Sequence, residues 1–127
     1  MKITPSTSAI NRVRDDGSKI TYYIFNEYEV HYGEIAPGVT QPWHHHPTIT
    51  ETLYIIEGKI MLHYLQNGTK VEKEIVLGDV IEVEATPHTF SNPFKEKCKM
   101  IAFRFVPQGK DQREFIKNDK VLHPELA

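Results

Sequence analysis

Hydrophobic and polar residues alternate along most of the chain, in short runs rich in Val, Ile, Tyr, Phe and Thr. Alternation with a period of two residues predicts β-strands with one buried face, and the runs are separated by Gly, Pro and Asn, which favour turns. Asn67-Gly68 predicts a tight hairpin, and Gly58 joins two apolar runs directly. The predicted strands cover residues 20–25, 28–36, 43–46, 51–58, 59–65, 70–77, 78–84, 88–92 and 98–106.

Helical periodicity is almost absent, so the pattern predicts an all-β fold, either a barrel or a sandwich, with room inside for one small ligand. The length of 127 residues suits one domain over 1–127. Within it we expect a polar N-terminal arm over 1–20, a barrel over 20–106 and a C-terminal tail over 107–127. Residues 111–123 of that tail are compatible with a short helix or with a packed arm.

Composition narrows the location and the partners. The formal net charge is −2, which does not favour nucleic acid or an anionic membrane as a partner. Cys98 is the single cysteine, so no internal disulfide forms, and it is expected to be a small buried apolar residue. The sequence shows no signal-peptide pattern and no apolar stretch of about 20 residues, so we expect a cytoplasmic protein.

The unusual feature is the run Trp43-His44-His45-His46. In an extended segment successive side chains point to opposite faces, so His44 and His46 share one face and His45 lies on the other. Two imidazoles on one face predict a metal site only if further ligands come from elsewhere in the chain.

Two residues are candidates for those further ligands. Glu51 has the same parity as Leu53 and Ile55, which are expected in the core; a buried carboxylate is costly, and a bound cation would explain it. His88 shares its parity with Phe90, which indicates an inward face. Asn92 is expected to hold a loop through side-chain hydrogen bonds.

Other polar residues receive less specific expectations. His31 and His63 lie in strands, where a solvated face is favoured over a pocket-lining position. Arg104 stands between Phe103 and Phe105, which predicts an outward charge between two core rings. Several tyrosines are expected to be shared between the core and the pocket.

The spacing of glycines, histidines and acidic residues resembles the cupin family. The first cupin motif is matched by Gly38, five residues, His44, one residue, His46, four residues, Glu51, six residues and Gly58. The second motif resembles Gly78-Asp79 followed by His88, three residues and Asn92. Between them the chain departs from the family, because the segment before His88 is one residue shorter and has Glu84 and Thr86 near the usual proline and glycine.

This resemblance implies an antiparallel jelly-roll cupin barrel, of the RmlC-like type. It also implies one divalent metal ion (Fe, Mn, Ni, Co, Cu or Zn), held by His44, His46, Glu51 and His88. The expected function is an enzyme acting on a small polar metabolite, as an oxygenase or as an isomerase of a sugar or keto acid.

Two alternatives remain. One is a non-catalytic module that binds or senses a small molecule or a metal, and the other is a metal-free epimerase-like cupin, against which the presence of Glu51 argues. Small cupins commonly pair through a barrel face, so the resemblance also implies a homodimer.

Overall fold

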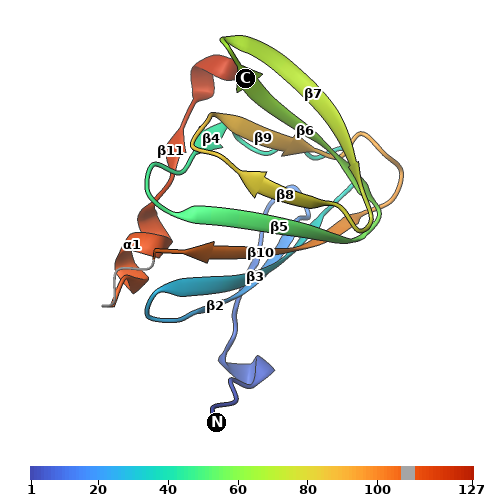
Figure 1. The fold of residues 1–127 in the computed structure, drawn as a ribbon. Coiled ribbons are helices and arrows are strands. Elements are labelled where there is room, and N and C mark those ends of the chain that lie inside the picture. Colours follow the sequence, from blue (N-terminus) through green and yellow to red (C-terminus); the bar gives the residue numbers. More distant parts are fainter. Residues whose placement is uncertain (107–110) are drawn as a thin grey trace.

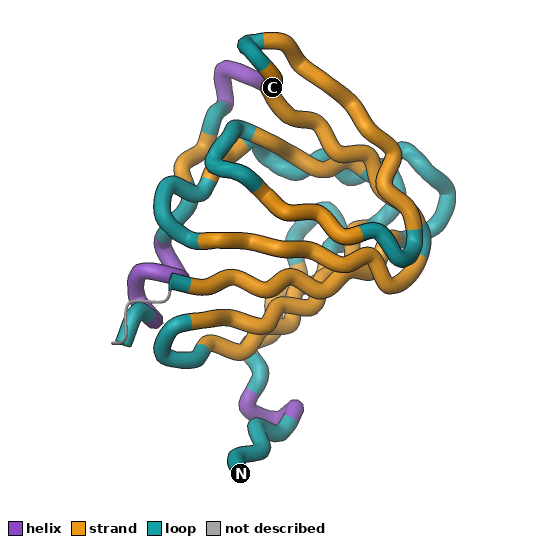
Figure 2. The backbone as a smooth tube through the Cα atoms, in the orientation of Figure 1, coloured by secondary structure: helices purple, strands orange, loops and turns teal. Residues whose placement is uncertain are grey.

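Two antiparallel β-sheets face each other in a computed structural model that describes residues 1–106 and 111–127 (Figure 1). Strands dominate these described residues, in which helix occurs only in short segments near the N-terminus and in the C-terminal part (Figure 2). The expected all-β fold is confirmed, and the two facing antiparallel sheets form a jelly roll.

The first sheet has six strands. In spatial order they are β1 (Ile10–Val13), β2 (Lys19–Ile24), β3 (Tyr28–Ile35), β10 (Cys98–Phe105), β5 (Thr50–Glu57) and β8 (Val80–Val83). The second sheet has five strands, in the order β11 (Val121–Leu122), β4 (His44–His45), β9 (His88–Ser91), β6 (Lys59–Gln66) and β7 (Thr69–Val76). The short helical segments are η1 (Ser6–Ser8), α1 (Arg113–Asn118) and η2 (Pro124–Leu126).

Two tight turns form where the sequence predicts them. Asn67 and Gly68 both have positive φ, 51° and 76°, as a two-residue hairpin with matched twist requires. Gly58 has φ 74°, and a Cβ built there would lie 2.6 Å from the carbonyl oxygen of Lys97. The β5–β6 connection therefore needs glycine both for its backbone conformation and for the close approach of Lys97.

The register of the first sheet decides which side chains face inward. β10 lies between β3 and β5, and Ala102 pairs with both His31 and Leu53. The inner face carries Ala102, which is 3% exposed, and the outer face carries Phe103, which is 44% exposed. Because Arg104 shares the face of Ala102, the expectation of an outward Arg104 between two core rings is wrong.

Aliphatic side chains fill one part of the space between the sheets. Ile55 and Ile60 are fully buried there. The rest of the inner faces carries polar side chains around a cavity, so the core occupies only part of the interior. The remaining members of this buried cluster are Ile35, Val39, Leu53, Ile81, Phe90, Cys98, Met100 and Ala102.

The two ends of the chain add to the sheets. β1, which lies in the segment expected as a polar arm, pairs with β2 along its whole length. The segment after 110 contains both the expected helix, α1, and a packed strand, β11, which pairs with β4. Among the described residues, no helix has the length and apolar character needed to cross a membrane.

Candidate metal centre

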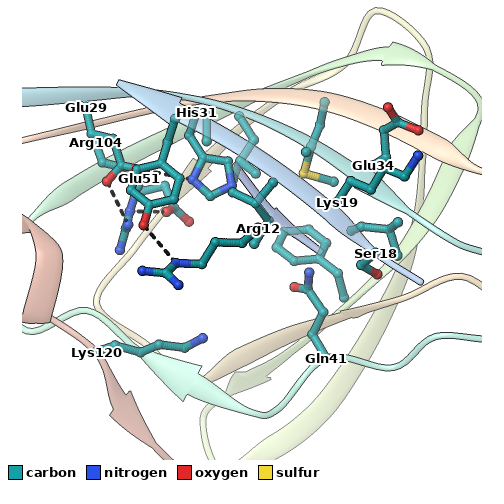
Figure 3. A pocket seen from close by; sticks show the side chains of 18 of the residues that line it. Arg12, Ser18, Lys19, Glu29, His31, Glu34, Gln41, Glu51, Arg104 and Lys120 are labelled. Atoms are coloured by element: carbon teal, nitrogen blue, oxygen red, sulfur yellow. Dashed lines mark hydrogen bonds and ion pairs between the residues drawn. The ribbon is translucent and has the colours of Figure 1, made fainter. Parts of the chain in front are cut away.

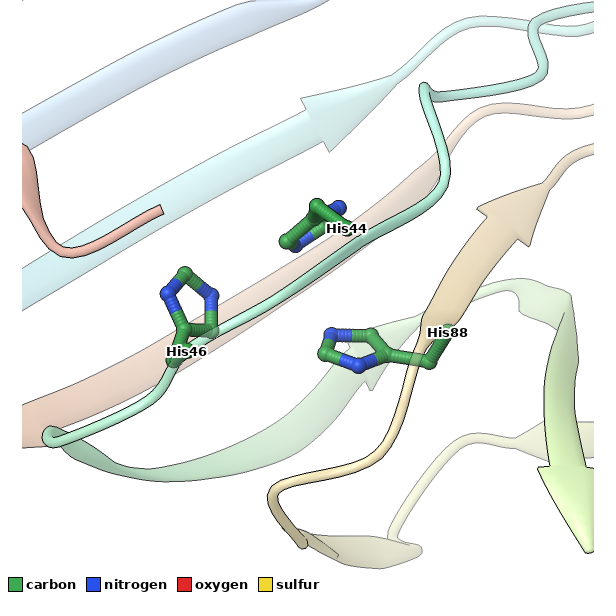
Figure 4. Close-up of side chains that lie close together, drawn as sticks. All are labelled: His44, His46 and His88. Carbon is green, nitrogen blue, oxygen red and sulfur yellow. The ribbon is translucent and has the colours of Figure 1, made fainter. Parts of the chain in front are cut away.

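His44, His46 and His88 meet in the interior, with one nitrogen of each ring within 4.8 Å of the others (Figure 4). Strand pairing explains the meeting, because His44 and His88 are direct partners between β4 and β9. His46 follows β4 with the same parity as His44. All three are buried, at 7%, 5% and 2% exposure.

His45 faces away from this group, as its parity predicts. Its Nδ1 lies 2.6 Å from Nε2 of His123, which follows β11. Nδ1 of His123 lies 2.8 Å from a carboxylate oxygen of Glu125. His45 therefore helps to attach the C-terminal segment to β4.

Each ring of the buried trio donates an Nδ1–H to a backbone carbonyl oxygen. The acceptors are Pro42 for His44, at 2.8 Å, and Thr86 for His88, at 2.9 Å. His46 donates in the same way to the carbonyl oxygen of Asp119. A carbonyl oxygen only accepts, so Nδ1 carries the proton and Nε2 of each ring keeps a free lone pair.

Burial also holds these rings in the neutral state. Loss of solvation lowers the pKa of His44 to about 3, despite the hydrogen bond to Pro42 that favours the charged form. Burial likewise lowers the pKa of His46 and of His88, although the negative charge of Glu51 opposes both shifts. Neutral imidazoles with inward lone pairs are the form that binds a metal.

One polar atom of the trio has no partner within the described residues. Nε2 of His88 is fully buried and makes no hydrogen bond in residues 1–106 and 111–127. A buried polar atom without a partner is costly, and a divalent ion bound to the three Nε2 atoms would remove that cost. These three histidines could therefore hold a metal ion.

Glu51 lies at the edge of the trio and contacts a second partner. Its Oε2 is 3.7 Å from Nε2 of His46 and 2.9 Å from Nε of Arg104. The Arg104 contact is an ion pair without the direction of a hydrogen bond. The role of Glu51 as a fourth ligand stays a prediction. It is compatible with the contact to Arg104, because that contact is not a directed hydrogen bond that would hold the carboxylate away from the histidines.

Arg104 joins Glu51 to a second buried carboxylate, Glu29. Nη1 of Arg104 is 3.1 Å from Oε2 of Glu29, which is only 3% exposed. The other oxygen of Glu29 accepts a hydrogen bond from Nδ1 of His31 at 2.9 Å. Sequence reasoning missed this network, although Glu29 and His31 share the parity of the buried Ile35 and thus carried a usable signal.

A cavity of about 280 Å³ opens beside these groups (Figure 3). Its lining includes His44, His46, Glu51 and Arg104, together with His31, whose expected solvated position is wrong. The cavity is small by the standard of ligand sites, which usually measure roughly 300–1,000 Å³. It therefore suits a metabolite of few atoms.

Two residues outside the cavity behave as expected. The amide of Asn92 donates to the carbonyl oxygens of Ile35 and Glu96, so it holds the loop before β10. Cys98 is fully buried, and burial raises the pKa of its thiol to about 11, which makes it a poor nucleophile. A third residue, His63, is hydrogen-bonded through Nε2 to the hydroxyl of Ser91, and its Nδ1 lies 3.2 Å from the carboxylate of Glu72 on β7.

Sequence comparison agrees with the fold and with the position of the site. A family model described as a cupin domain matches residues 31–104, more than half of the chain. The chain belongs to the cupin domain family. The matched region contains all four residues that the resemblance implies as ligands, and it excludes β1 and the C-terminal segment.

Individual relatives are distant or match only in part. A germin-like protein from Ipomoea nil is 41% identical over 49 residues, 38% of this cupin and 23% of that protein. A point variant of oxalate decarboxylase from B. subtilis has a TM-score of 0.73 at 17% identity, covering 93% of this chain and 31% of that one. This cupin thus spans less than a third of the length of either protein.

A third comparison involves a chain of more similar length. A sugar phosphate isomerase of the cupin superfamily from Silicibacter pomeroyi has a TM-score of 0.69 at 18% identity. The match covers 82% of this chain and 75% of that one. Identities this low show a shared fold and leave the reaction of this cupin to its own residues.

We expect Arg104→Met to lower the free energy of unfolding by about 3–5 kcal/mol, because it leaves Glu29 and Glu51 buried without their shared cation. The matched control on the same strand is Lys99→Met, which removes a more exposed ion pair with Glu57 and should cost about 1 kcal/mol or less. Urea unfolding followed by circular dichroism measures both, and equal losses would show that Arg104 is not a central partner of the two acids.

In chelator-treated protein, acid should destabilise the fold through the three histidines. Their folded-state pKa lies below the unfolded value of 6.5, so the unfolded chain binds more protons as the pH falls. The stability present above pH 6.5 is lost as the pH approaches 3, by a total of order 3 kcal/mol or more.

Urea unfolding at a series of pH values, repeated with His44→Gln, provides the measurement. The free energy of unfolding of His44→Gln should depend clearly less on pH than that of the control His45→Gln, which changes the neighbouring histidine outside the trio. A pH dependence that is the same in both variants would contradict the assignment.

Proposed function

We propose that this cupin domain binds one divalent transition-metal ion through His44, His46 and His88, with Glu51 as the fourth protein ligand. The observation that carries the proposal is the convergence of three buried Nε2 lone pairs, one of them without any partner in the described residues. Three histidines and a carboxylate suit Fe, Mn, Ni, Co, Cu or Zn. Bound there, such an ion supplies Lewis acidity or, for a redox-active metal, electron transfer with dioxygen.

We further propose that the domain is an enzyme acting on a small polar metabolite in the adjoining cavity. The cavity reaches His44, His46 and Glu51, so a molecule inside it lies next to the proposed metal ligands. Its volume of about 280 Å³ favours a small molecule or a small reacting group. Oxidation and isomerisation are the two reaction types that fit, and the structural neighbours include enzymes named for a decarboxylation and for an isomerisation.

His31 is the residue best placed to move a proton. Its Nδ1–H is donated to Glu29, so its Nε2 is available for proton exchange on the cavity side. Glu29 orients the ring by accepting this hydrogen bond. Arg104, which contacts both Glu29 and Glu51, holds the relative positions of the proposed base and of the proposed fourth ligand.

Elemental analysis of tag-free protein tests the metal proposal. We expect about one equivalent of a divalent transition metal per chain, lost in His44→Ala and in His88→Ala because each removes one of three converging nitrogens. His45→Ala is the control and should keep the metal. No metal in the native protein, and none taken up from Fe(II), Mn(II), Ni(II) or Zn(II), would overturn the proposal.

Oxygen consumption and isomer formation with candidate metabolites then separate the two reaction types. A redox-active metal with substrate-dependent oxygen uptake supports the oxygenase. His31→Gln should keep the metal and lose most turnover, whereas a variant without metal loses both. Tight ligand binding without turnover under any condition would instead identify a non-catalytic binding module.

We also propose a homodimer that forms through the outer face of the six-stranded sheet. Tyr28, Tyr54, Phe103 and Phe105 lie on that face, and each is at least 37% exposed. Light scattering should give a molar mass of twice the chain mass of 14.7 kDa. Phe103→Glu should lower the measured mass to that of the monomer, because it places a charge in the apolar contact. A monomer at all concentrations would contradict the proposal.

A further inference from the structure

Basic side chains outnumber acidic ones around the cavity, although the whole chain carries a formal charge of −2. Among the described residues, the lining contains three carboxylates: Glu29, Glu34 and Glu51. Six cationic side chains from the same described ranges line this space, three more than the carboxylates: Arg12, Arg14, Lys19, Arg104, Lys117 and Lys120.

The acids of the lining already have cationic partners. Glu29 and Glu51 share Arg104, and Glu34 is 3.1 Å from Nζ of Lys97. Arg104 is therefore committed to carboxylates inside the protein. The excess positive charge resides on the other basic residues of the lining.

Four of these residues form a group that we call the cationic mouth: Arg12, Arg14, Lys117 and Lys120. Arg12, Lys117 and Lys120 are exposed and Arg14 is half-buried, so they lie where the cavity meets solvent. In residues 1–106 and 111–127, none of the four forms an ion pair with a carboxylate. Figure 3 shows Arg12 and Lys120 extending over the cavity from opposite sides.

The chain brings the mouth together from its two ends. Arg12 in β1 pairs with Ile20 and shares the inner face, and Arg14 follows with the same parity. Lys117 lies in α1, and Lys120 precedes β11. Reduced solvation is the main cause that lowers the pKa of Lys120; the charges of Arg14 and Arg104 add to it, and the negative charge of Glu51 opposes it.

Arg12 donates a hydrogen bond to the hydroxyl of Tyr22 at 3.1 Å, whereas a buried polar group that lines the same cavity has no partner among the described residues. Ser18 is 2% exposed, lines the cavity, and its Oγ makes no hydrogen bond within the described part of the chain. A buried hydroxyl without a hydrogen-bond partner is costly, and a bound anion with oxygen acceptors would satisfy it and attract the four cations.

We propose that the ligand is a small dicarboxylate, with one carboxylate directed to the histidine trio and the second held by the cationic mouth. This inference rests on the proposed function for the first carboxylate, whereas the mouth stands on its own residues. Two carboxylates match the two groups of residues that line the cavity, the proposed metal ligands His44, His46 and Glu51 and the cationic mouth. The limited volume favours a short carbon chain between them.

The test is isothermal titration of the Zn(II)-loaded and the chelator-treated protein with three probes: malonate, malonamide and inorganic phosphate. Malonamide has the shape of malonate without its charge. We expect malonate to bind at least about tenfold more tightly than malonamide, because charge-assisted hydrogen bonds are much stronger than neutral ones. Arg14→Gln combined with Lys120→Gln should weaken malonate binding about tenfold or more.

A control variant with the same change in net charge distinguishes specific binding at the cationic mouth from general attraction of malonate to a positively charged protein surface. Lys2→Gln combined with Lys95→Gln removes two exposed positive charges that do not line the cavity. This variant should leave malonate binding unchanged within about twofold. Equal weakening in both double variants would overturn the cationic mouth.

The metal content of every sample keeps this inference distinguishable from the proposed function. A protein that takes up zinc but binds malonate no better than malonamide retains the metal centre and overturns the dicarboxylate. A protein that takes up no zinc but still binds malonate through Arg14 and Lys120 overturns the metal centre and supports the mouth. Preference for phosphate over malonate would also overturn the dicarboxylate, in favour of a phosphate ester.

Discussion

Three hydrogen bonds from imidazole rings to backbone carbonyl oxygens determine what the site can do. They leave His44, His46 and His88 with Nδ1 protonated and Nε2 directed inward. A carbonyl acceptor fixes the tautomer without a charge, so the ring stays neutral and is not made much more basic, as a carboxylate would make it. Burial acts in the same direction, and the two effects together produce three neutral donors around one point.

His31 shows the opposite arrangement within the same cavity. Its Nδ1–H is donated to the carboxylate of Glu29. The cavity is thus lined by two kinds of histidine: His44 and His46 donate to a neutral carbonyl oxygen, and His31 donates to a carboxylate. The difference comes from the acceptor of a single hydrogen bond and not from the strand on which each residue lies.

Much of the fold can be predicted from the sequence. Alternation locates most of the strands, and Gly58 and Asn67-Gly68 locate two turns, because these signals are local. Parity separates His44 and His46 from His45, and it places His88 on the inner face, for the same reason.

Other features of the fold and the site have no local signal in the sequence, or their signal is misleading. Aromatic residues are usually buried, which favours the core for Phe103 and Phe105; their exposure on the outer face reverses the expected direction of Arg104. β1 escapes prediction because a strand whose inner side lines a charged cavity lacks an apolar stripe. The contact between Asp119 and His46 depends on a backbone carbonyl, which any residue carries.

That contact gives the C-terminal segment a role in the timing of assembly. His46 and Asp119 are 73 residues apart, and the carboxylate of Asp119 also accepts hydrogen bonds from the amides of Thr48 and Ile49. A growing chain that has reached His88 contains all three histidines but lacks the acceptor that orients His46. The centre is therefore completed by a contact of high sequence separation, which cannot form until the segment that follows the three histidines has been synthesised.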